Sequence, residues 1–199
     1  MDVRNAEFSS SSEIEAACQV LAKGGLVIVP TETVYGVACD PAIPNTIEKL
    51  IALKGRSENK PFAWLVSDAA LVQAEVKEWS SGLDALVTRY WPGSLTLVLE
   101  TVSGWKGYRI PEHPVALELI KKYGKPLVLT SANRSGEKET RSTTEAKKTL
   151  KISSVLEGGI LSEDSQPSTV VKVEDKKLFC LREGAIAFEE IKSIFLAGG

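Results

Sequence analysis

Two short strings of polar residues carry the side chains in this chain that are best suited to holding phosphate. Lys54-Gly55-Arg56 places an ammonium and a guanidinium two residues apart, and Ser131-Ala132-Asn133 places a hydroxyl close to an amide. Each string follows a predicted helix or strand, where a pocket could form. Because the whole chain has a formal net charge of −2, such concentrated donors indicate a small polyanion, with a nucleoside triphosphate as the natural candidate, rather than a nucleic-acid surface.

The first string ends an apolar helical face. Apolar residues at positions 47, 50 and 51 share one helical stripe with Lys54, which predicts an ammonium carried to the interior edge of the fold. Gly55 lets the chain turn, so that Lys54 and Arg56 can converge on one anion, and Lys60 adds a third charge. Taken alone, the same residues also fit a helix end whose lysines complement the helix dipole and extend into water.

The second string emerges from a predicted strand. Residues 126–129 form a short apolar run, and Thr130 and Ser131-Ala132-Asn133 follow it directly. Ligands of α/β sheets bind at the carboxyl ends of strands, where short hydroxyl and amide groups can hold phosphate or ribose. By itself such a string more often forms a turn or a helix cap. The combination of the two strings favours a ligand site.

Standard phosphate and hydrolase motifs are absent. Gly24-Gly25 precedes a predicted strand rather than a helix, so it forms neither a P-loop nor a Rossmann turn. No Gly-x-Ser-x-Gly elbow surrounds Ser131, and the only histidine, His113, lies between Glu112 and Pro114. A serine-hydrolase triad is therefore not predicted.

The composition is that of an ordinary globular protein. With 199 residues, 43% of them hydrophobic and 25% charged, the chain is expected to form one domain over residues 1–199. No apolar run reaches the roughly 20 residues of a membrane helix, and the N-terminus lacks the features of a secretory signal or transit peptide, so we expect a cytoplasmic protein with no membrane association. Cys18, Cys39 and Cys180 lack metal-site spacing and are expected to be reduced thiols, with Cys18 in the core.

Periodicity predicts alternating helices and strands. Helices are expected over residues 12–24 (with a capping box at Ser12), 45–54, 69–78, 82–90, 114–123, 143–150 and 188–196. Strands are expected over residues 26–29, 62–66, 95–99, 127–130, 169–173 and 178–181, with a hairpin between 94 and 110 that turns at Ser103-Gly104. This order predicts an α/β fold with a mixed sheet rather than a repeated βαβ unit.

The chain resembles the YrdC-like family of threonylcarbamoyl-AMP synthases, in its short form without the extra C-terminal domain. The resemblance extends from before Pro30 to Ala185. The matching motifs, in order, are Pro30-Thr31-Glu32-Thr33-Val34-Tyr35-Gly36, Lys54-Gly55-Arg56, Trp91-Pro92-Gly93, Arg109-x-Pro-x-His-Pro, Ser131-Ala132-Asn133, Ser168-Thr169-Val170-Val171 and Leu181-Arg182-x-Gly-Ala. Ser57 and Ser94 stand where the family usually has proline.

The resemblance implies a twisted, mixed or antiparallel sheet flanked by helices around a positively lined cavity, the YrdC-like α/β fold. It also implies a nucleotidyltransferase that forms threonylcarbamoyl-AMP and pyrophosphate from L-threonine, bicarbonate and ATP, with Mg²⁺ accompanying the ATP. The product would pass to the machinery that makes threonylcarbamoyladenosine in tRNA.

The resemblance also assigns site residues. The ATP-binding residues would be Lys54, Arg56, Lys60, Ser131, Asn133, Thr143 and Arg182. Lys54 and Arg56 would be the catalytic pair, and Thr33, Arg109 and Ser168 would recognise threonine, with the arginine holding the carboxylate. Tyr35 and His113 would be wall and scaffold. No protein nucleophile is required, because a carbamate oxygen attacks the α-phosphorus directly.

Two alternative functions stay open. A YciO-like paralogue could share the fold and serve as an RNA-binding module, or it could make a different carbamoyl adenylate. The charge argues against the first alternative, because 24 basic residues are outnumbered by 26 acidic ones and are scattered. A rim of the cavity could still contact tRNA weakly.

Overall fold

The computed structural model describes residues 8–55, 62–134, 136–162 and 164–199, and its centre is one eight-stranded mixed sheet. The strands are β1 (Val27–Val29), β2 (Gly36–Cys39), β3 (Ala63–Leu65), β4 (Leu95–Thr101), β5 (Gly104–Arg109), β6 (Leu127–Ser131), β7 (Thr169–Glu174) and β8 (Lys177–Arg182). They lie in the order β1-β2-β6-β3-β5-β4-β7-β8. The pairs β3–β5 and β4–β7 are parallel, and the others are antiparallel. The predicted α/β class and mixed sheet are confirmed.

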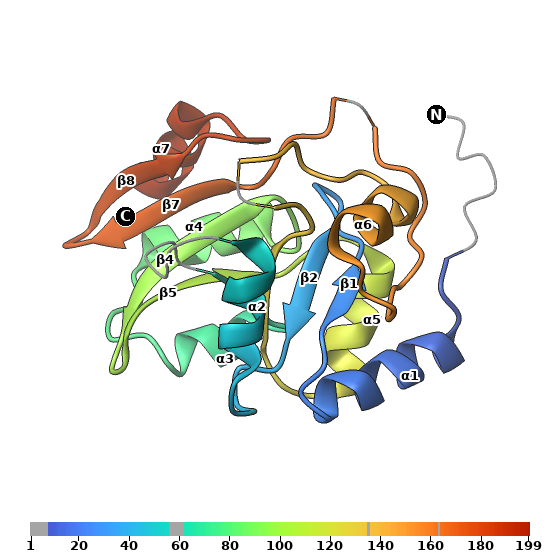
Figure 1. Cartoon of the computed structure of the whole chain (residues 1–199). Helices are drawn as coiled ribbons and strands as arrows, with labels where there is room; N and C mark the ends of the chain where they lie inside the picture. The colour runs from blue at the N-terminus through green and yellow to red at the C-terminus, as the bar shows by residue number, and fades with distance from the viewer. Residues whose placement is uncertain (1–7, 56–61, 135, 163) are drawn as a thin grey trace.

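Helices cover both faces of this sheet (Figure 1). They are α1 (Ser11–Ala22), α2 (Thr46–Lys54), α3 (Ala69–Gln73), α4 (Ser81–Tyr90), α5 (Pro114–Tyr123), α6 (Thr143–Leu150) and α7 (Phe188–Ala197). One core cluster joins α1 and α5 to β1, β2 and β6, and a second joins α2 and α6 to the opposite face of the same strands. A third packs α4 and α7 against β4 and β7. No helix in the described part of the chain is both long and apolar enough to cross a membrane.

The N-cap of the first helix lies two residues before its expected position. Ser10, not Ser12, is the N-cap: its hydroxyl accepts from the backbone N–H of Glu13, and the Glu13 carboxylate accepts in return from the N–H of Ser10. The sequence contains four consecutive serines, so only the position of Glu13 at the third helical residue selects among them. Cys18 lies in the core as expected.

Two other elements differ from the sequence prediction. Strand β2 was not predicted, because four residues beginning with Gly36 show no clear periodicity and are held as a strand by pairing with β1 and β6. Helix α3 ends at Gln73 rather than near residue 78, since Val76 forms a β-bridge with Thr101 and draws the chain away from the helix. In both cases tertiary pairing overrides local preference.

The ends of β5 and β8 lie at one edge of the sheet, and the end of β6 lies toward the opposite edge. Strand β5 ends at Arg109, β6 at Ser131 and β8 at Arg182. Ser168 lies directly before β7, whose first residue pairs with the start of β4. Polar residues from both edges nevertheless line one hollow that lies against the sheet.

The position of the first helix cap can be tested by substitution. Ser10→Ala should lower the free energy of unfolding by about 1 kcal/mol, because the N–H of Glu13 loses its acceptor. Ser12→Ala is the matched control and should change it by only a few tenths of a kcal/mol, because the exposed Ser12 hydroxyl contacts the Ser10 hydroxyl at 3.0 Å and not the N–H of Glu13. Urea denaturation measures both, and an equal loss from the two variants would contradict the assignment.

Candidate functional site

A cavity of about 270 Å³ lies against the sheet between these residues. It brings together the predicted site residues Thr33, Lys54, Arg109, Ser131, Asn133, Ser168 and Arg182. Apolar walls come from residues such as Phe62, Val98 and Leu129. The two groups that resemblance assigned to threonine and to ATP therefore line one chamber.

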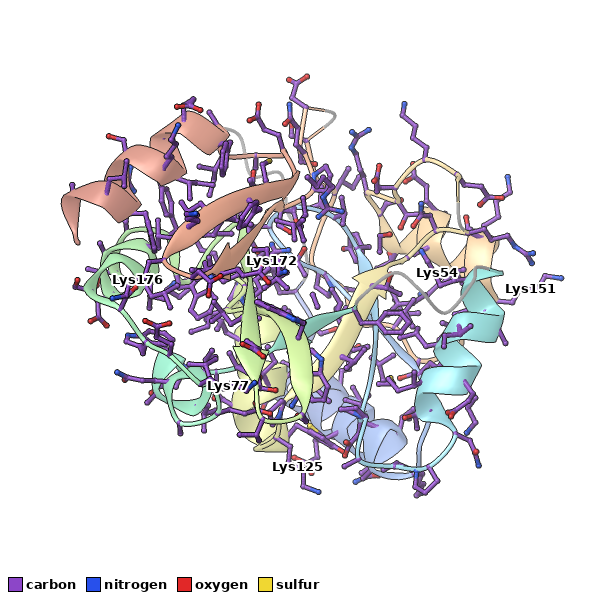
Figure 2. All side chains as sticks on the ribbon, turned by 90° about the vertical axis from the view of Figure 1, so that its left-hand side faces the viewer. Lys54, Lys77, Lys125, Lys151, Lys172 and Lys176 are labelled. Atoms are coloured by element: carbon purple, nitrogen blue, oxygen red, sulfur yellow. The ribbon has the colours of Figure 1, made fainter. Side chains whose placement is uncertain are left out.

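Lys54 and the end of β6 form one side of this cavity. Helix α2 ends at Lys54, whose side chain is 3% exposed and reaches the strand end (Figure 2). Its Nζ donates to the carbonyl of Ser131 at 2.6 Å, to Oδ1 of Asn133 at 2.8 Å, and also to the carbonyl of Asn133. The Ser131 hydroxyl donates to the same Oδ1 at 2.6 Å. The ammonium thus holds the Ser131–Asn133 loop in one conformation, as well as placing a positive charge in the cavity.

Arg109 forms a second side and is held from behind. Its Nε donates to the carbonyl of Gly93 at 3.0 Å, and its Nη2 donates to Thr33 Oγ1 at 2.9 Å and to the carboxylate of Glu32. The guanidinium is nearly buried, with its side chain 5% exposed. A cation fixed in this way at a cavity wall is suited to bind a carboxylate.

Ser168 and Arg182 form a third side. Arg182 donates through Nε and Nη2 to the carbonyl of Ser168, at 3.1 and 2.8 Å, and through Nη2 to the Ser168 hydroxyl. Thr96 lies 2.8 Å from that hydroxyl. Burial lowers the pKa of Arg182, the charge of Glu139 opposes this effect, and the nearby charge of Arg109 adds to it. Two guanidinium groups that face the same cavity favour an anion between them.

Of the remaining predicted residues, only Thr143 is described by the structure. Arg56 and Lys60 lie outside the described residues. Thr143 stands at the first turn of α6 and is not one of the cavity residues; its hydroxyl donates to the carboxylate of Glu157 at 2.7 Å. In this structure it supports the α6 end of the fold, because Glu157 takes the bond that a nucleotide would need.

Tyr35 and His113 hold the chain segment around Gly158. The Tyr35 hydroxyl donates to the carbonyl of Gly159 at 2.7 Å and accepts from the N–H of Gly158, and burial raises its pKa to about 12. His113 Nδ1 accepts from the N–H of Val115, so its proton is on Nε2, which faces the carbonyl of Gly158 at 3.2 Å. Both residues are scaffold, as expected.

The sequence analysis missed several residues at the cavity. Glu139 and Thr96 line it, and Glu32 supports Arg109 from outside it. Thr96 lies in an apolar strand and Glu139 in a charged loop, so nothing in their local sequence marked them. Glu32 stood within the quoted motif Pro30 to Gly36, which was the available signal.

Comparison with known proteins shows the family and the fold of the chain. The Sua5/YciO/YrdC family model, described as "Telomere recombination", matches residues 19–184. A threonylcarbamoyl-AMP synthase of Pseudoalteromonas translucida is 31% identical over 186 residues, covering 86% of this chain and 99% of that protein. The crystal structure of Pyrococcus abyssi Sua5 complexed with L-threonine superposes with a TM-score of 0.87 at 28% identity, covering 94% of this chain, which spans 58% of the length of that protein. Escherichia coli YciO shares the fold, with a TM-score of 0.82 at 23% identity over 92% of this chain and 94% of that one.

The environment of His113 predicts a dependence of stability on pH. Burial lowers the pKa of His113, against weaker opposing effects of Gly158 and Glu32, so the unfolded chain binds a proton more readily than the folded one. Neutral His113 makes its full contribution to the free energy of unfolding at pH values above the unfolded pKa of about 6.5. This contribution is lost as the pH falls from there through the lower folded pKa.

Urea denaturation between pH 7.5 and 5 measures this effect. Because His113 is the only histidine, His113→Asn should flatten the decline in this range while retaining a side chain able to cap α5. An identical pH dependence in the wild type and the variant would contradict the prediction.

Proposed function

The chain belongs to the Sua5/YciO/YrdC family, and we propose that it is an L-threonylcarbamoyladenylate synthase, which joins L-threonine, bicarbonate and ATP into threonylcarbamoyl-AMP and pyrophosphate. The observation that carries the proposal is the single cavity lined by Arg109, Ser131 and Arg182. An amino acid at Arg109 and a nucleotide at Ser131 and Arg182 would lie in the same chamber. The names of relatives of similar length support this assignment.

We assign the threonine side of the cavity to Thr33, Arg109 and Ser168. Arg109 is the buried cation there, and Thr33 and Ser168 present hydroxyl groups. A carboxylate would bind the guanidinium, while the hydroxyls would distinguish the amino-acid side chain, because a site built for a hydroxyl group rejects analogues that lack it.

We assign the nucleotide side to Arg182 and to the Ser131–Asn133 loop held by Lys54. Arg182 and Lys54 would compensate phosphate charge, and the loop would contact phosphate or ribose. Arg56 and Lys60 remain assigned to the phosphates, and Arg56 is retained with Lys54 as the catalytic pair, on their sequence motif alone. Thr143 is assigned to ATP only if its hydroxyl leaves Glu157 when the nucleotide binds.

The proposed reaction needs no covalent enzyme intermediate. Bicarbonate loses its hydroxyl group as water, the threonine amine forms a bond to the resulting carbon dioxide and gives up a proton to become a carbamate, and a carbamate oxygen then attacks the α-phosphorus of ATP as the bond to pyrophosphate breaks. None of the described cavity residues is a cysteine or histidine, and the Ser131 proton is already donated to Asn133. Catalysis would rest on alignment and on charge compensation by Lys54, Arg56 and Arg182.

A magnesium ion fits this cavity as a companion of ATP. The described residues contain no group of three or more histidine, cysteine, aspartate or glutamate side chains that could hold a resident metal. Glu139 does line the cavity, and Mg²⁺ in nucleotide sites uses one or two carboxylates together with substrate phosphates. Glu139 would hold the ion, which when bound would neutralise charge on the departing pyrophosphate.

The product of this reaction is a reactive mixed anhydride, so an acceptor must consume it. We assign that role to the tRNA threonylcarbamoyl-transfer machinery. Direct RNA binding has less support, because Lys125 and Lys151 project from separate parts of the periphery rather than forming a basic stripe (Figure 2).

The activity can be tested by mass analysis of the products. The protein, incubated with ATP, Mg²⁺ and labelled bicarbonate, should form labelled threonylcarbamoyl-AMP when L-threonine is present, and much less adenylate when L-serine replaces it. Arg56→Ala should abolish pyrophosphate release while the circular dichroism spectrum remains that of a folded protein. Formation of the adenylate without threonine, or full activity in Arg56→Ala, would contradict the proposal.

Because threonine and ATP are assigned to different sides of the cavity, a substitution on one side should change the KM for one substrate and not for the other. Arg109→Met should raise the KM for threonine roughly 10- to 100-fold, and Arg182→Met should raise the KM for ATP by a similar factor, because each loses a charge-assisted hydrogen bond. Arg89→Met, at an exposed arginine of α4, is the control and should leave both values unchanged. Equal effects of either cavity variant on both substrates would show that the two sides are not separate.

A further inference from the structure

The carboxylate of Glu32 lies behind Arg109 and ties three chain segments together. Its Oε1 accepts from Arg109 Nη2 and weakly, at 3.4 Å, from the Ser94 hydroxyl, and its Oε2 accepts from the N–H of Glu112 at 3.0 Å. Its side chain is 18% exposed. Glu32 does not line the cavity, so it can act on a ligand there only through the groups that it holds.

The hydrogen bonds of Arg109 leave one nitrogen for a ligand. Nε donates to Gly93, and the two N–H groups of Nη2 are accounted for by Glu32 and Thr33. Nη1 makes no hydrogen bond to any residue in the described part of the chain, and Arg109 lines the cavity. A substrate carboxylate would therefore meet Nη1, and the contact between Glu32 and Nη2 decides where Nη1 points.

The proton of Thr33 can be placed in the same way. Thr31 donates its hydroxyl proton to the carbonyl of Val34 at 2.6 Å, so in the 2.9 Å contact between Thr31 and Thr33 the donor is Thr33. The Thr33 oxygen also accepts from Arg109. Thr33 therefore offers the cavity a lone pair and no proton, which suits an N–H or O–H group of the substrate.

We propose that Glu32 is a positioning residue, which orients Arg109 so that Nη1 receives the carboxylate of the amino-acid substrate while the Thr33 lone pair receives its amine or hydroxyl proton. The inference rests on the proposed function of this cavity. Glu32 accepts hydrogen bonds from Arg109 and from the N–H of Glu112 with different oxygens, and it balances the charge of a buried arginine; a carboxylate does both. A glutamine would turn its amide group toward either Arg109 or the N–H of Glu112, so that two donors would face each other.

The test compares Glu32→Gln with the wild type of the full chain. KM for L-threonine is measured at saturating ATP and bicarbonate, and KM for ATP at saturating threonine. We expect the threonine KM to rise roughly 10- to 100-fold, since a charge-assisted hydrogen bond is lost, and the ATP KM to stay within about twofold. Glu112→Gln is the matched control, because its exposed carboxylate takes no part in these contacts, and it should leave both values unchanged.

L-Threoninamide separates positioning from a general structural effect. This analogue lacks the carboxylate, so the wild type should bind it far more weakly than threonine when both compete with labelled threonine. Glu32→Gln should reduce this discrimination by about the factor by which the threonine KM rises. Unchanged discrimination, or an equal rise in both KM values, would overturn the inference.

Two further outcomes distinguish a failure of this inference from a failure of the proposed function and from a failure of the variant to fold. A wild type that makes no threonylcarbamoyl-AMP overturns the proposed function, whereas an active wild type with an unaffected Glu32→Gln variant overturns only the role of Glu32. If Glu32→Gln does not fold, Glu32→Asp is used. It keeps the charge but cannot reach both Arg109 and the N–H of Glu112, so its threonine KM should rise by a smaller factor, and an unchanged KM would overturn the inference.

Discussion

The structure depends on holding three positive charges around one cavity, two of them, Lys54 and Arg109, on buried side chains. Lys54, Arg109 and Arg182 line one cavity, and Arg109 is near enough to Arg182 to lower its pKa. Each cation is held by fixed acceptors of the protein: Lys54 by the Ser131–Asn133 loop, Arg109 by Glu32 and Gly93, and Arg182 by Ser168. These acceptors offset the cost of desolvation and leave a positive field that favours an anionic ligand.

The mixed sheet makes this arrangement possible. At one edge of the sheet β5 and β8 end while β4 and β7 begin, whereas β6 ends toward the opposite edge, and residues from both edges line the cavity. Side chains at strand ends are held more rigidly than those on long loops, because the ladder hydrogen bonds fix the backbone beneath them. A site for two substrates at once needs this rigidity, since both must be aligned for an in-line displacement.

The acceptors that hold the cations also limit what the site residues can do. The hydroxyl proton of Ser131 is donated to Asn133, that of Thr33 is donated to Thr31, and two of the three nitrogens of Arg109 are occupied. Residues selected from the sequence as ligand contacts are therefore partly internal supports. Lys54 illustrates this, because its ammonium organises the loop that would contact the nucleotide.

The sequence by itself determined the α/β class, most helices and strands, the hairpin of β4 and β5 and the cation-rich motifs, because hydrophobic period, turn residues and residue chemistry are local properties. The family resemblance then named most residues that line the cavity. Only the tertiary structure decided that β2 is a strand, that Thr143 bonds Glu157, and that Glu32 and Glu139 flank the site. These features arise from contacts between residues far apart in the chain, and no local pattern encodes which partner a buried polar group will find.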